Sequence, residues 1–397
     1  MTPPTSDRRL PAGIVGSLTL LVIGWTGLLV PSLIRSIKVT FDQTDAGIGV
    51  VYLVYSVAYA LGSVLGGQIM ERIGRRTVLV GAAVLHGSGI AGFGLAPSWP
   101  LFLLAMLPAG LGAGCLDGGS NGLVLDVYRE GRGRAMNLLH VWFSVGALLA
   151  PLLIGRAVDA GLSWEAVMLL SAAPLAALAL AYALVPMPSG RRTPGVKQTA
   201  AADTGPLLSG PLILLGVAIA SYVAAEIGVS NWLVRFLEPA PLATATLALS
   251  LMWAGATVGR LLSSAIADRF DHLRFTFTCV VLMGFAIGIA VAAPTLPLSI
   301  AFFTLAGVAS GPVFPMIVAL GGERYPERSA AVGGSLVGFA VIGSTIYPPA
   351  IGFLSVTVGL PIAMAGNALL CLVGAGALVA FGRTTDRAPG DVVPEGG

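Results

Sequence analysis

Charged residues are scarce in this chain, and their scarcity indicates which solvent surrounds it. Asp, Glu, Lys and Arg make up only 10% of the 397 residues, and hydrophobic residues make up 56%. Soluble domains carry about 25% charged residues, so a soluble protein of two or three domains could not cover its surface with so few. With a mean hydropathy of +0.89, the composition indicates a polytopic membrane protein.

Cysteine and histidine are also rare, with three residues of each. Cys115, Cys279 and Cys371 lie in apolar segments, which gives no indication of a disulfide framework. The Cys and His spacings match no zinc site. We therefore expect no bound metal.

Nucleotide-binding motifs are missing as well. The pattern G-x-x-x-x-G-K-[ST] is absent, which leaves ATP-driven transport by this chain without support. The stretch G-L-G-A-G at 110–114 lacks the strand–turn–helix context of a dinucleotide-binding fold. We expect neither an enzyme nor a cofactor.

Long apolar runs, by contrast, are abundant. A helix needs roughly 20 apolar residues to cross a bilayer, and the chain has about twelve such runs. The predicted spans are 12–35, 46–70, 77–96, 100–127, 135–158, 164–186, 211–237, 242–267, 275–294, 297–322, 330–356 and 360–382. The first run is too long for a signal-peptide core and no A-x-A-like site follows it, so we expect it to be retained. The predicted fold is an all-α membrane protein with twelve transmembrane helices.

The basic residues predict the orientation of these spans. Most of the 22 Lys and Arg residues fall in alternate loops, such as ERIGRR and YREGRGR, whereas the opposite loops APSWP, APTLP and SVTVGL have none. Because cytoplasmic loops are enriched in Lys and Arg, we expect both termini in the cytoplasm and the protein in the cytoplasmic (inner) membrane. The exceptions on the opposite side are Arg35, Lys38 and Arg156.

A polar stretch divides the chain into nearly equal halves. Residues 187–210 are rich in Pro, Gly and Thr, which is typical of a flexible linker. We expect an N-terminal six-helix bundle at 1–186, a cytoplasmic linker at 187–210 and a C-terminal six-helix bundle at 211–397.

The two halves resemble each other at a single ungapped offset of 197 residues. The matching positions are Glu71-Arg72 with Asp268-Arg269, Gly110 and Gly114 with Gly307 and Gly311, Tyr128 and Glu130 with Tyr325 and Glu327, and Gly146, Pro151, Ile154 and Gly155 with Gly343, Pro348, Ile351 and Gly352. Parallel six-span repeats occur in transporters that bind substrate near the midplane, between the halves.

The loop after the second span carries a family resemblance. GGQIMERIGRR resembles the major facilitator signature G-x-x-x-D-R-x-G-R-R, with Glu71 in place of Asp. The resemblance implies a cytoplasmic latch made by Gly67, Glu71, Arg72, Gly74, Arg75 and Arg76. The second-half echo SSAIADRFDHLR keeps Asp268 and Arg269 but has Ser264 and Asp271 in place of the glycines. The alternative is a basic loop that only sets topology.

Further segments resemble the fucose–proton symporter family, which includes glucose/mannose symporters. They are G-L-G-A-G-C-L-D-G-G-S-N in span four, Y-V-A-A-E-I-G-V-S-N-W-L in span seven, W-A-G-A-T-V-G-R in span eight and G-P-V-F-P in span ten. The acidic residue that the fucose symporter has in span one is absent from GWTGLLVPSLI. The resemblance implies cation-coupled sugar transport.

Asp117 is a carboxylate inside an apolar span. Such residues are costly and usually face a cavity or a partner. Helical spacing places Gly110, Gly114, Asp117 and Asn121 on one face, where a neighbouring helix or a ligand could approach closely. Asp117 could be protonated reversibly during transport, could coordinate Na⁺, or could be a permanently hydrogen-bonded packing residue.

Glu226 is the corresponding acidic residue of the second half. Tyr222 and Ser230 lie at i−4 and i+4 and extend a polar stripe along span seven. Carboxylates accept hydrogen bonds from several hydroxyl donors, and in the sugar transporters that this chain resembles the same region contacts sugar hydroxyls. We expect Glu226 to bind substrate or to couple transport, with a structural pairing to Arg235 or Arg260 as the alternative.

Aromatic and histidine residues complete the candidate site. Trp25, Trp142 or Trp232 could stack on a pyranose ring, or could anchor the membrane interface. His140 could relay protons to Asp117 or serve only in helix contact. His86 is interpreted as structural.

These features predict a secondary active transporter that imports a small polar solute, a hexose-type sugar, together with a coupling cation, which we expect to be H⁺, with Na⁺ as the alternative. The expected partners are therefore that solute, that cation and the lipid bilayer, without nucleic acid, and a monomer would suffice. The alternatives are proton-coupled efflux of drugs or metabolites, and a transport-inactive receptor or scaffold. The intramembrane carboxylates Asp117 and Glu226 argue against a scaffold, which has no need of them.

Overall fold

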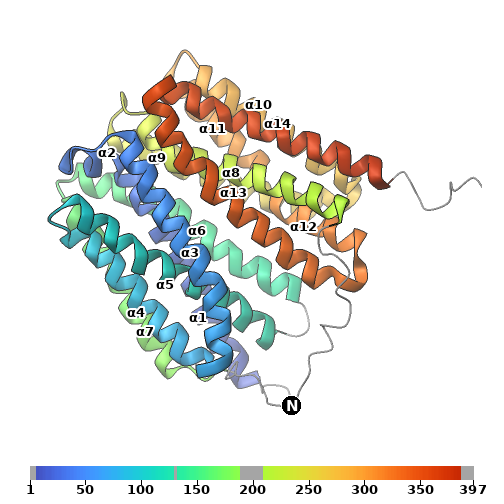
Figure 1. Cartoon of the computed structure of the whole chain (residues 1–397), viewed down its shortest axis with the longest axis horizontal. Coiled ribbons are helices and arrows are strands. Elements are labelled where there is room, and N and C mark those ends of the chain that lie inside the picture. Colours follow the sequence, from blue (N-terminus) through green and yellow to red (C-terminus); the bar gives the residue numbers. More distant parts are fainter. Residues whose placement is uncertain (1–5, 129–131, 188–208, 386–397) are drawn as a thin grey trace, which may run out of the picture. The chain divides into compact units, whose positions relative to one another are not determined.

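The computed structural model describes residues 6–128, 132–187 and 209–385, and within these ranges every regular element is a helix (Figure 1). The elements are α1 Ser6–Gly27, α2 Leu29–Thr40, α3 Asp45–Ile73, α4 Arg75–Leu95, α5 Trp99–Val127, α6 Arg132–Asp159, α7 Trp164–Leu184, α8 Gly210–Phe236, α9 Leu242–Ile266, η2 Ala267–Arg269, α10 His272–Ala292, α11 Leu296–Ser310, α12 Val313–Arg324, η3 Pro326–Arg328, α13 Ser329–Val358 and α14 Leu360–Thr385.

The prediction of twelve spans is confirmed. Twelve helical segments of the described ranges are long and apolar enough to cross a membrane, and the protein is a multi-pass membrane protein. Local signals set several boundaries: Thr44, Ser163 and Asp271 cap α3, α7 and α10 by accepting a hydrogen bond from a backbone N–H of the first turn. Gly74 separates α3 from α4 with a φ of 98°, a conformation that glycine adopts without steric cost.

Two spans consist of two helices each. Span one comprises α1 and α2, which meet at Leu28, and span ten comprises α11 and α12, which meet at Gly311 and Pro312. Pro312 has no backbone N–H and cannot continue the hydrogen-bond ladder of α11. The prolines of span eleven, Pro348 and Pro349, lie inside the continuous helix α13.

Glycines let helix backbones approach closely, and they do so at the same positions of the two repeats. A Cβ added to Gly62 would lie 2.2 Å from Leu111 O, and one added to Gly259 would lie 2.0 Å from Val308 O. Likewise, a Cβ on Gly114 would lie 2.0 Å from Tyr59 O, and one on Gly311 would lie 2.3 Å from Ala256 O. Each pair of contacts follows the 197-residue offset. The packing of α3 on α5 is therefore repeated by α9 on α11.

This packing gives a direct prediction about stability. We expect Gly114→Ala to destabilise the protein by about 1–3 kcal/mol, because the new methyl group would force α5 away from the α3 backbone. Gly81→Ala is the matched control, since Gly81 is helical, exposed and has nothing within 4 Å of an added Cβ. Thermal unfolding of the purified protein in detergent measures both changes. An unchanged melting temperature for Gly114→Ala would contradict the close approach.

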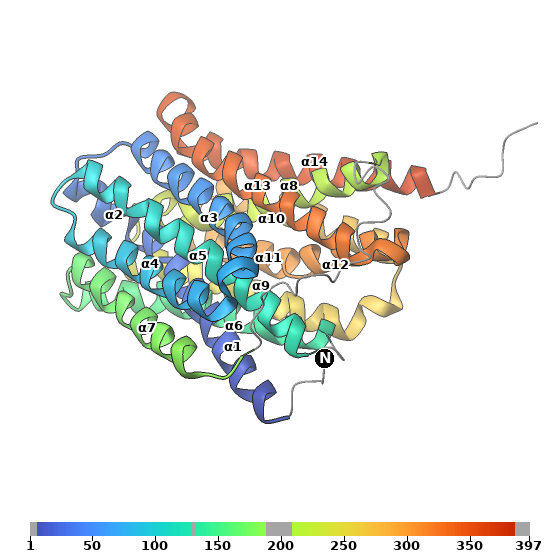
Figure 2. The same cartoon turned by 60° about the horizontal axis from the view of Figure 1, so that its bottom comes forward.

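The chain forms two compact units that are not simply its two halves. The first comprises Met1–Gln198, Ser230–Ala254 and Pro348–Leu360, and the second comprises Thr199–Val229, Gly255–Tyr347 and Pro361–Gly397. Within the first unit, α3 and α4 pack on α5, α4 packs on α7, and α1 packs on α6 (Figures 1 and 2). The predicted linker lies almost wholly outside the described residues, and the division into two six-helix bundles stays a prediction.

Candidate functional site

Asp117 lies on α5, ten residues before the helix ends at Val127 and thus about 15 Å along its axis from that end. Its two carboxylate oxygens have different partners. Tyr59 of α3 donates its hydroxyl to Oδ2, and Asn121 Nδ2 donates to Oδ1 over 3.1 Å. Asn121 Oδ1 is buried and has no hydrogen-bond partner among the described residues. Two donors thus hold the half-buried carboxylate of Asp117, and the neighbouring amide oxygen of Asn121 accepts no hydrogen bond from the described residues.

The helix face predicted around Asp117 packs against α3. Gly110 and Gly114 of this face meet the backbone at Tyr55 and Tyr59, so the small residues admit a helix at this level. Sequence reasoning missed Tyr59. Its only indication in the sequence was a second tyrosine, Tyr55, one turn earlier on α3. In the structure the centroids of the two rings lie 6.3 Å apart.

Glu226 lies on α8 and is only 6% exposed. The Tyr222 side chain lies one turn away, beside both Glu226 and Arg260. Glu226 Oε1 is buried and has no hydrogen-bond partner within the described ranges. Arg260 Nε also donates to Gly311 O over 3.4 Å. A carboxylate, a phenol and a guanidinium therefore gather in the second unit.

The other cation considered for Glu226 has different partners. Arg235 Nε donates to Asp45 Oδ1 over 2.9 Å, and Arg235 also pairs with Glu238. Of the two arginines considered from the sequence, Arg260 is the one that lies beside Tyr222 together with Glu226 in the second unit.

The three candidate tryptophans differ in their surroundings. Trp25 Nε1 donates to Ser171 Oγ over 3.0 Å, which ties α1 to α7. Trp232 is fully buried, with its Nε1 donating to Pro348 O over 2.8 Å and its ring edge-on to Tyr52. Helix α8 continues without a break past Trp232 to Phe236. Trp142 on α6 is 39% exposed.

The two membrane-embedded histidines also differ. His140 lies on α6 with an exposed side chain. His86 is fully buried, and its Nε2 and Nδ1 lie 2.9 Å from Thr26 Oγ1 and 2.8 Å from Ala109 O. Both ring nitrogens of His86 are thus engaged in helix packing, as the structural interpretation expected.

The signature loop holds the start of α4 against neighbouring helix ends. Arg75 is only 7% exposed, and its Nη2 lies 2.5 Å from Asp126 Oδ2 near the end of α5. Arg76 Nη2 donates to Val185 O, just after α7, over 2.9 Å. Gly67, Glu71 and Arg72 lie exposed at the end of α3. Asp126 was not predicted, although it is the acidic partner of the most buried signature arginine.

The second half contains an equivalent of this ion pair. His272 Nδ1 lies 2.5 Å from Glu323 Oε1, and these residues follow Arg75 and Asp126 by the same 197 positions. Arg269 is exposed in η2, whereas the Asp268 side chain lies outside the described part. The degenerate second signature therefore keeps a polar contact at the position of the Arg75–Asp126 pair.

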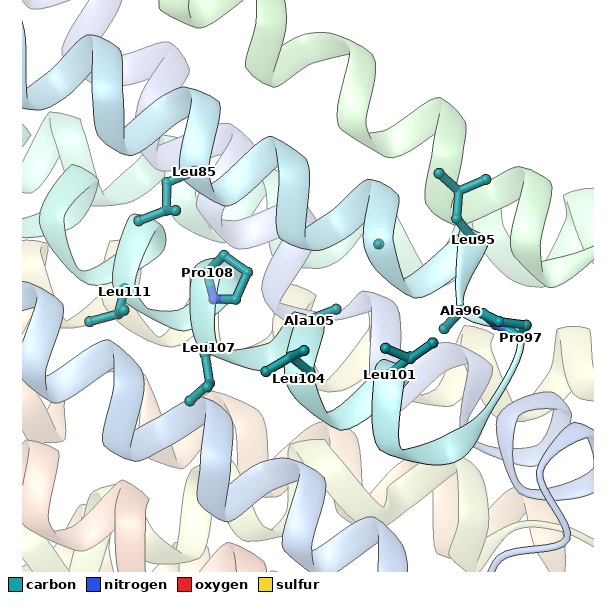
Figure 3. A pocket seen from close by; sticks show the side chains of 11 residues that line it. Leu85, Leu95, Ala96, Pro97, Leu101, Leu104, Ala105, Leu107, Pro108 and Leu111 are labelled. Atoms are coloured by element: carbon teal, nitrogen blue, oxygen red, sulfur yellow. The ribbon is translucent and has the colours of Figure 1, made fainter.

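An open pocket of about 550 Å³ on the surface of the first unit is distinct from these centres. Apolar side chains of α4 and α5 line it, among them Leu85, Leu95, Leu104 and Pro108 (Figure 3). None of the predicted site residues borders it. Among the described residues, no cluster of three or more His, Cys, Asp or Glu could hold a metal ion.

The fold and the buried polar centres define a polytopic helical membrane protein with transporter architecture. The chain belongs to the Major Facilitator Superfamily, whose sequence profile matches residues 14–239 and 212–397. The superfamily resemblance of the signature loop is thereby confirmed, and the protein is a transmembrane transporter, not an enzyme.

Several known proteins are similar along most of the chain. A gentisate transporter of Corynebacterium glutamicum is 24% identical over 370 residues, covering 88% of this chain and 82% of the relative. A glucose/galactose transporter of Brucella abortus is 25% identical over 389 residues, covering 90% and 92%. The crystal structure of a D-xylose–proton symporter superposes with a TM-score of 0.75 at 17% identity, covering 94% and 97%, which shows a shared fold.

Proposed function

We propose that this transporter imports a small polar solute, a hexose-type sugar, by cation-coupled symport with alternating access, and that the cation is H⁺. One observation carries the proposal: each half has an acidic group within an apolar span, Asp117 in α5 and Glu226 in α8. Ionisable groups at such depth are costly to insert and mark substrate or ion pathways.

The unused hydrogen-bonding capacity favours a solute rich in hydroxyl groups. Asn121 Oδ1 and Glu226 Oε1 are buried acceptors without partners among the described residues, and leaving such groups unpaired costs about 1–3 kcal/mol each. Sugar hydroxyls are donors and would satisfy them. The glucose/galactose transporter of Brucella abortus, similar over 90% of this chain, supports the same solute class.

The surroundings of Asp117 suit a coupling role. Its Oδ2 accepts from Tyr59 and its Oδ1 accepts from Asn121. Protonation adds an O–H donor and removes the negative charge of the acceptor, so the charge-assisted hydrogen bonds from Tyr59 and Asn121 become weaker. A proton on Asp117 would thereby weaken the Tyr59 contact that joins α3 to α5.

The remaining candidate residues keep their proposed roles. His140 is the candidate proton relay, and Trp142, with its partly exposed ring, is the candidate for stacking on the sugar. Trp25 and Trp232 are held through their indole N–H groups by Ser171 and Pro348, and the fully buried ring of Trp232 would have to become accessible before a sugar could stack on it. The basic loops support a cytoplasmic location for both termini.

A carboxylate-bearing solute is the second candidate. Arg260 lies beside the Tyr222–Glu226 pair and offers a guanidinium that can bind a carboxylate through two parallel hydrogen bonds. The gentisate transporter of Corynebacterium glutamicum, similar over 88% of this chain, favours this class.

Uptake into proteoliposomes tests the proposal. The assay offers labelled glucose, galactose, xylose and gentisate under imposed H⁺ or Na⁺ gradients. We expect accumulation of a hexose that requires the inward H⁺ gradient and collapses when a protonophore is added, with protein-free vesicles as the control. Accumulation of gentisate alone would favour the acid transporter. Accumulation of none, together with gradient-driven exclusion of lipophilic cations, would favour efflux.

A further inference from the structure

Arg35 and Lys38, two of the three exceptions to the distribution of basic residues, lie near the end of α2, at the end of the first unit opposite the signature loop. The Arg35 guanidinium caps the C-terminus of α8. Its Nε and Nη2 donate to Val234 O over 3.0 and 2.8 Å, Nη2 also donates to Leu237 O over 2.6 Å, and Nη1 donates to Ala240 O over 2.7 Å.

These acceptors suit a cation. The last carbonyls of a helix lack intrahelical partners and carry the negative end of the helix dipole. A planar guanidinium with five donors in a fixed fork can satisfy several of them at once. Arg35 therefore joins a helix of the first repeat to the end of a helix of the second.

Asp45, the first residue of α3, is a second connection between the repeats. It is only 7% exposed, pairs with Lys38 of α2, and accepts from Arg235 Nε of α8 over 2.9 Å. Ser355 Oγ of α13 lies 3.3 Å from its Oδ2 and can donate its single proton either there or to Gly352 O at 2.8 Å. One carboxylate thus connects α2 and α3 with α8 and α13.

Close packing at Gly352 adjoins this network. A Cβ on Gly352 would lie 2.4 Å from Asp45 O and 2.9 Å from Gly49 Cα, so the backbones of α13 and α3 meet there and nothing can pass between them. The internal repeat has a related contact at Gly155, where an added Cβ would lie 1.9 Å from the Thr246 side-chain oxygen Oγ1. Gly155 and Thr246 correspond to Gly352 and Gly49 through the 197-residue offset.

The contacts are nevertheless suited to breaking and re-forming. The Lys38 and Arg235 side chains keep 15% and 22% of their surface exposed, so solvent can reach these partners of the buried Asp45 and replace their hydrogen bonds. Exchange of protein partners for water keeps the net contribution of each bond modest. If these contacts only stabilised the fold, apolar side chains of similar volume would stabilise it as well or better, because they avoid the cost of desolvating charges.

We propose that Arg35, Asp45 and Arg235 form a polar gate at the extracytoplasmic end, closed in this structure, that opens to admit solute. This inference rests on the proposed function, since it assigns the gate to alternating access. Arg35 and Asp45 belong to the first repeat and Arg235 to the second. Opening requires that Arg35 release the α8 carbonyls and that Asp45 release Arg235.

A distance measurement tests the gate without any solute. Spin labels are placed at Val39 and Val358, which are 83% and 46% exposed on α2 and α13, in a cysteine-free background, and pulsed electron resonance gives the distance distribution. We expect Asp45→Asn and Arg35→Gln each to raise the population at long distance about tenfold, because each removes charge-assisted hydrogen bonds. Asp159→Asn is the control, because Asp159 is exposed at the same end of the molecule.

Arg35→Lys tests whether the closed gate depends on the shape of the guanidinium or only on its positive charge. Lysine keeps the positive charge but cannot form the fork, so we expect an intermediate shift. Distributions for Asp45→Asn and Arg35→Gln that match wild type would overturn the gate, whether or not uptake succeeds. Broad distributions together with a lowered melting temperature in both variants would mean that the network only holds the fold, which also overturns it. Conversely, failed uptake with the expected distance shifts would count against the proposed function alone.

Discussion

Asp117→Asn is expected to reduce gradient-driven accumulation to simple equilibration. Each pH unit supplies 1.36 kcal/mol per proton, so with one proton per solute a gradient of two pH units supports about a hundredfold accumulation. An amide cannot take up and release a proton at these pH values. The accumulation ratio should therefore fall from about one hundred to about one, since the proton gradient no longer acts on the solute.

The same variant should retain solute exchange. Exchange of internal for external solute involves no net proton movement, and asparagine is nearly isosteric with aspartate. Its amide oxygen can still accept the Tyr59 hydroxyl, which now bonds Asp117 Oδ2. The measurement compares accumulation under a gradient with counterflow at equal pH, using Asp159→Asn as the control.

Two outcomes would contradict the coupling role. Wild-type accumulation by Asp117→Asn would make Asp117 a packing residue. Loss of both accumulation and exchange, with an unchanged melting temperature, would place Asp117 in solute binding. Tyr59→Phe adds a further test, because it removes the hydroxyl that donates to Asp117 Oδ2 while keeping the carboxylate itself.

Glu226→Gln is expected to weaken solute binding about tenfold to a hundredfold. Hydrogen bonds to charged groups contribute about 1.5–3 kcal/mol, and the buried Oε1 of Glu226 is an acceptor with no partner among the described residues. Glutamine keeps the shape but offers a weaker, neutral acceptor. Binding of a labelled sugar to the purified transporter measures the change directly.

Arg260 makes a second variant necessary, because it lies beside the same cluster. If Glu226 serves only to balance Arg260, Glu226→Gln should lower the melting temperature and leave affinity unchanged, and Glu226→Gln combined with Arg260→Gln should restore stability. If Glu226 binds solute, affinity falls in the single variant and is not restored in the double one. The double-mutant cycle separates the two roles.

Much of the architecture could be predicted because it depends on local composition. A helix that crosses hydrocarbon must satisfy its own backbone hydrogen bonds and carry apolar side chains, and each span shows this in its own residues. The glycines at 114 and 311 could be matched by spacing alone, and the structure shows that they meet the backbones of α3 and α9, respectively. Burial of an acidic residue in an apolar run, as at Glu226, was equally evident before the structure.

The partners of those residues could not be predicted in the same way. Tyr59 with Asp117, Arg75 with Asp126, and Asp45 with Arg235 are separated by 58, 51 and 190 residues, and such pairings depend on how each helix is rotated and shifted against its neighbours. Arg35 and Lys38 were only exceptions to a charge rule until α8 and α3 were seen beside them.

The sequence by itself therefore determined the solvent, the number of spans and the internal repeat, because hydropathy and glycine spacing act within one helix or recur at a constant interval. Only the tertiary structure decided which side chains meet. A hydrogen bond extends over about 3 Å, whereas a helix turned by one residue moves its side chains through about 100°.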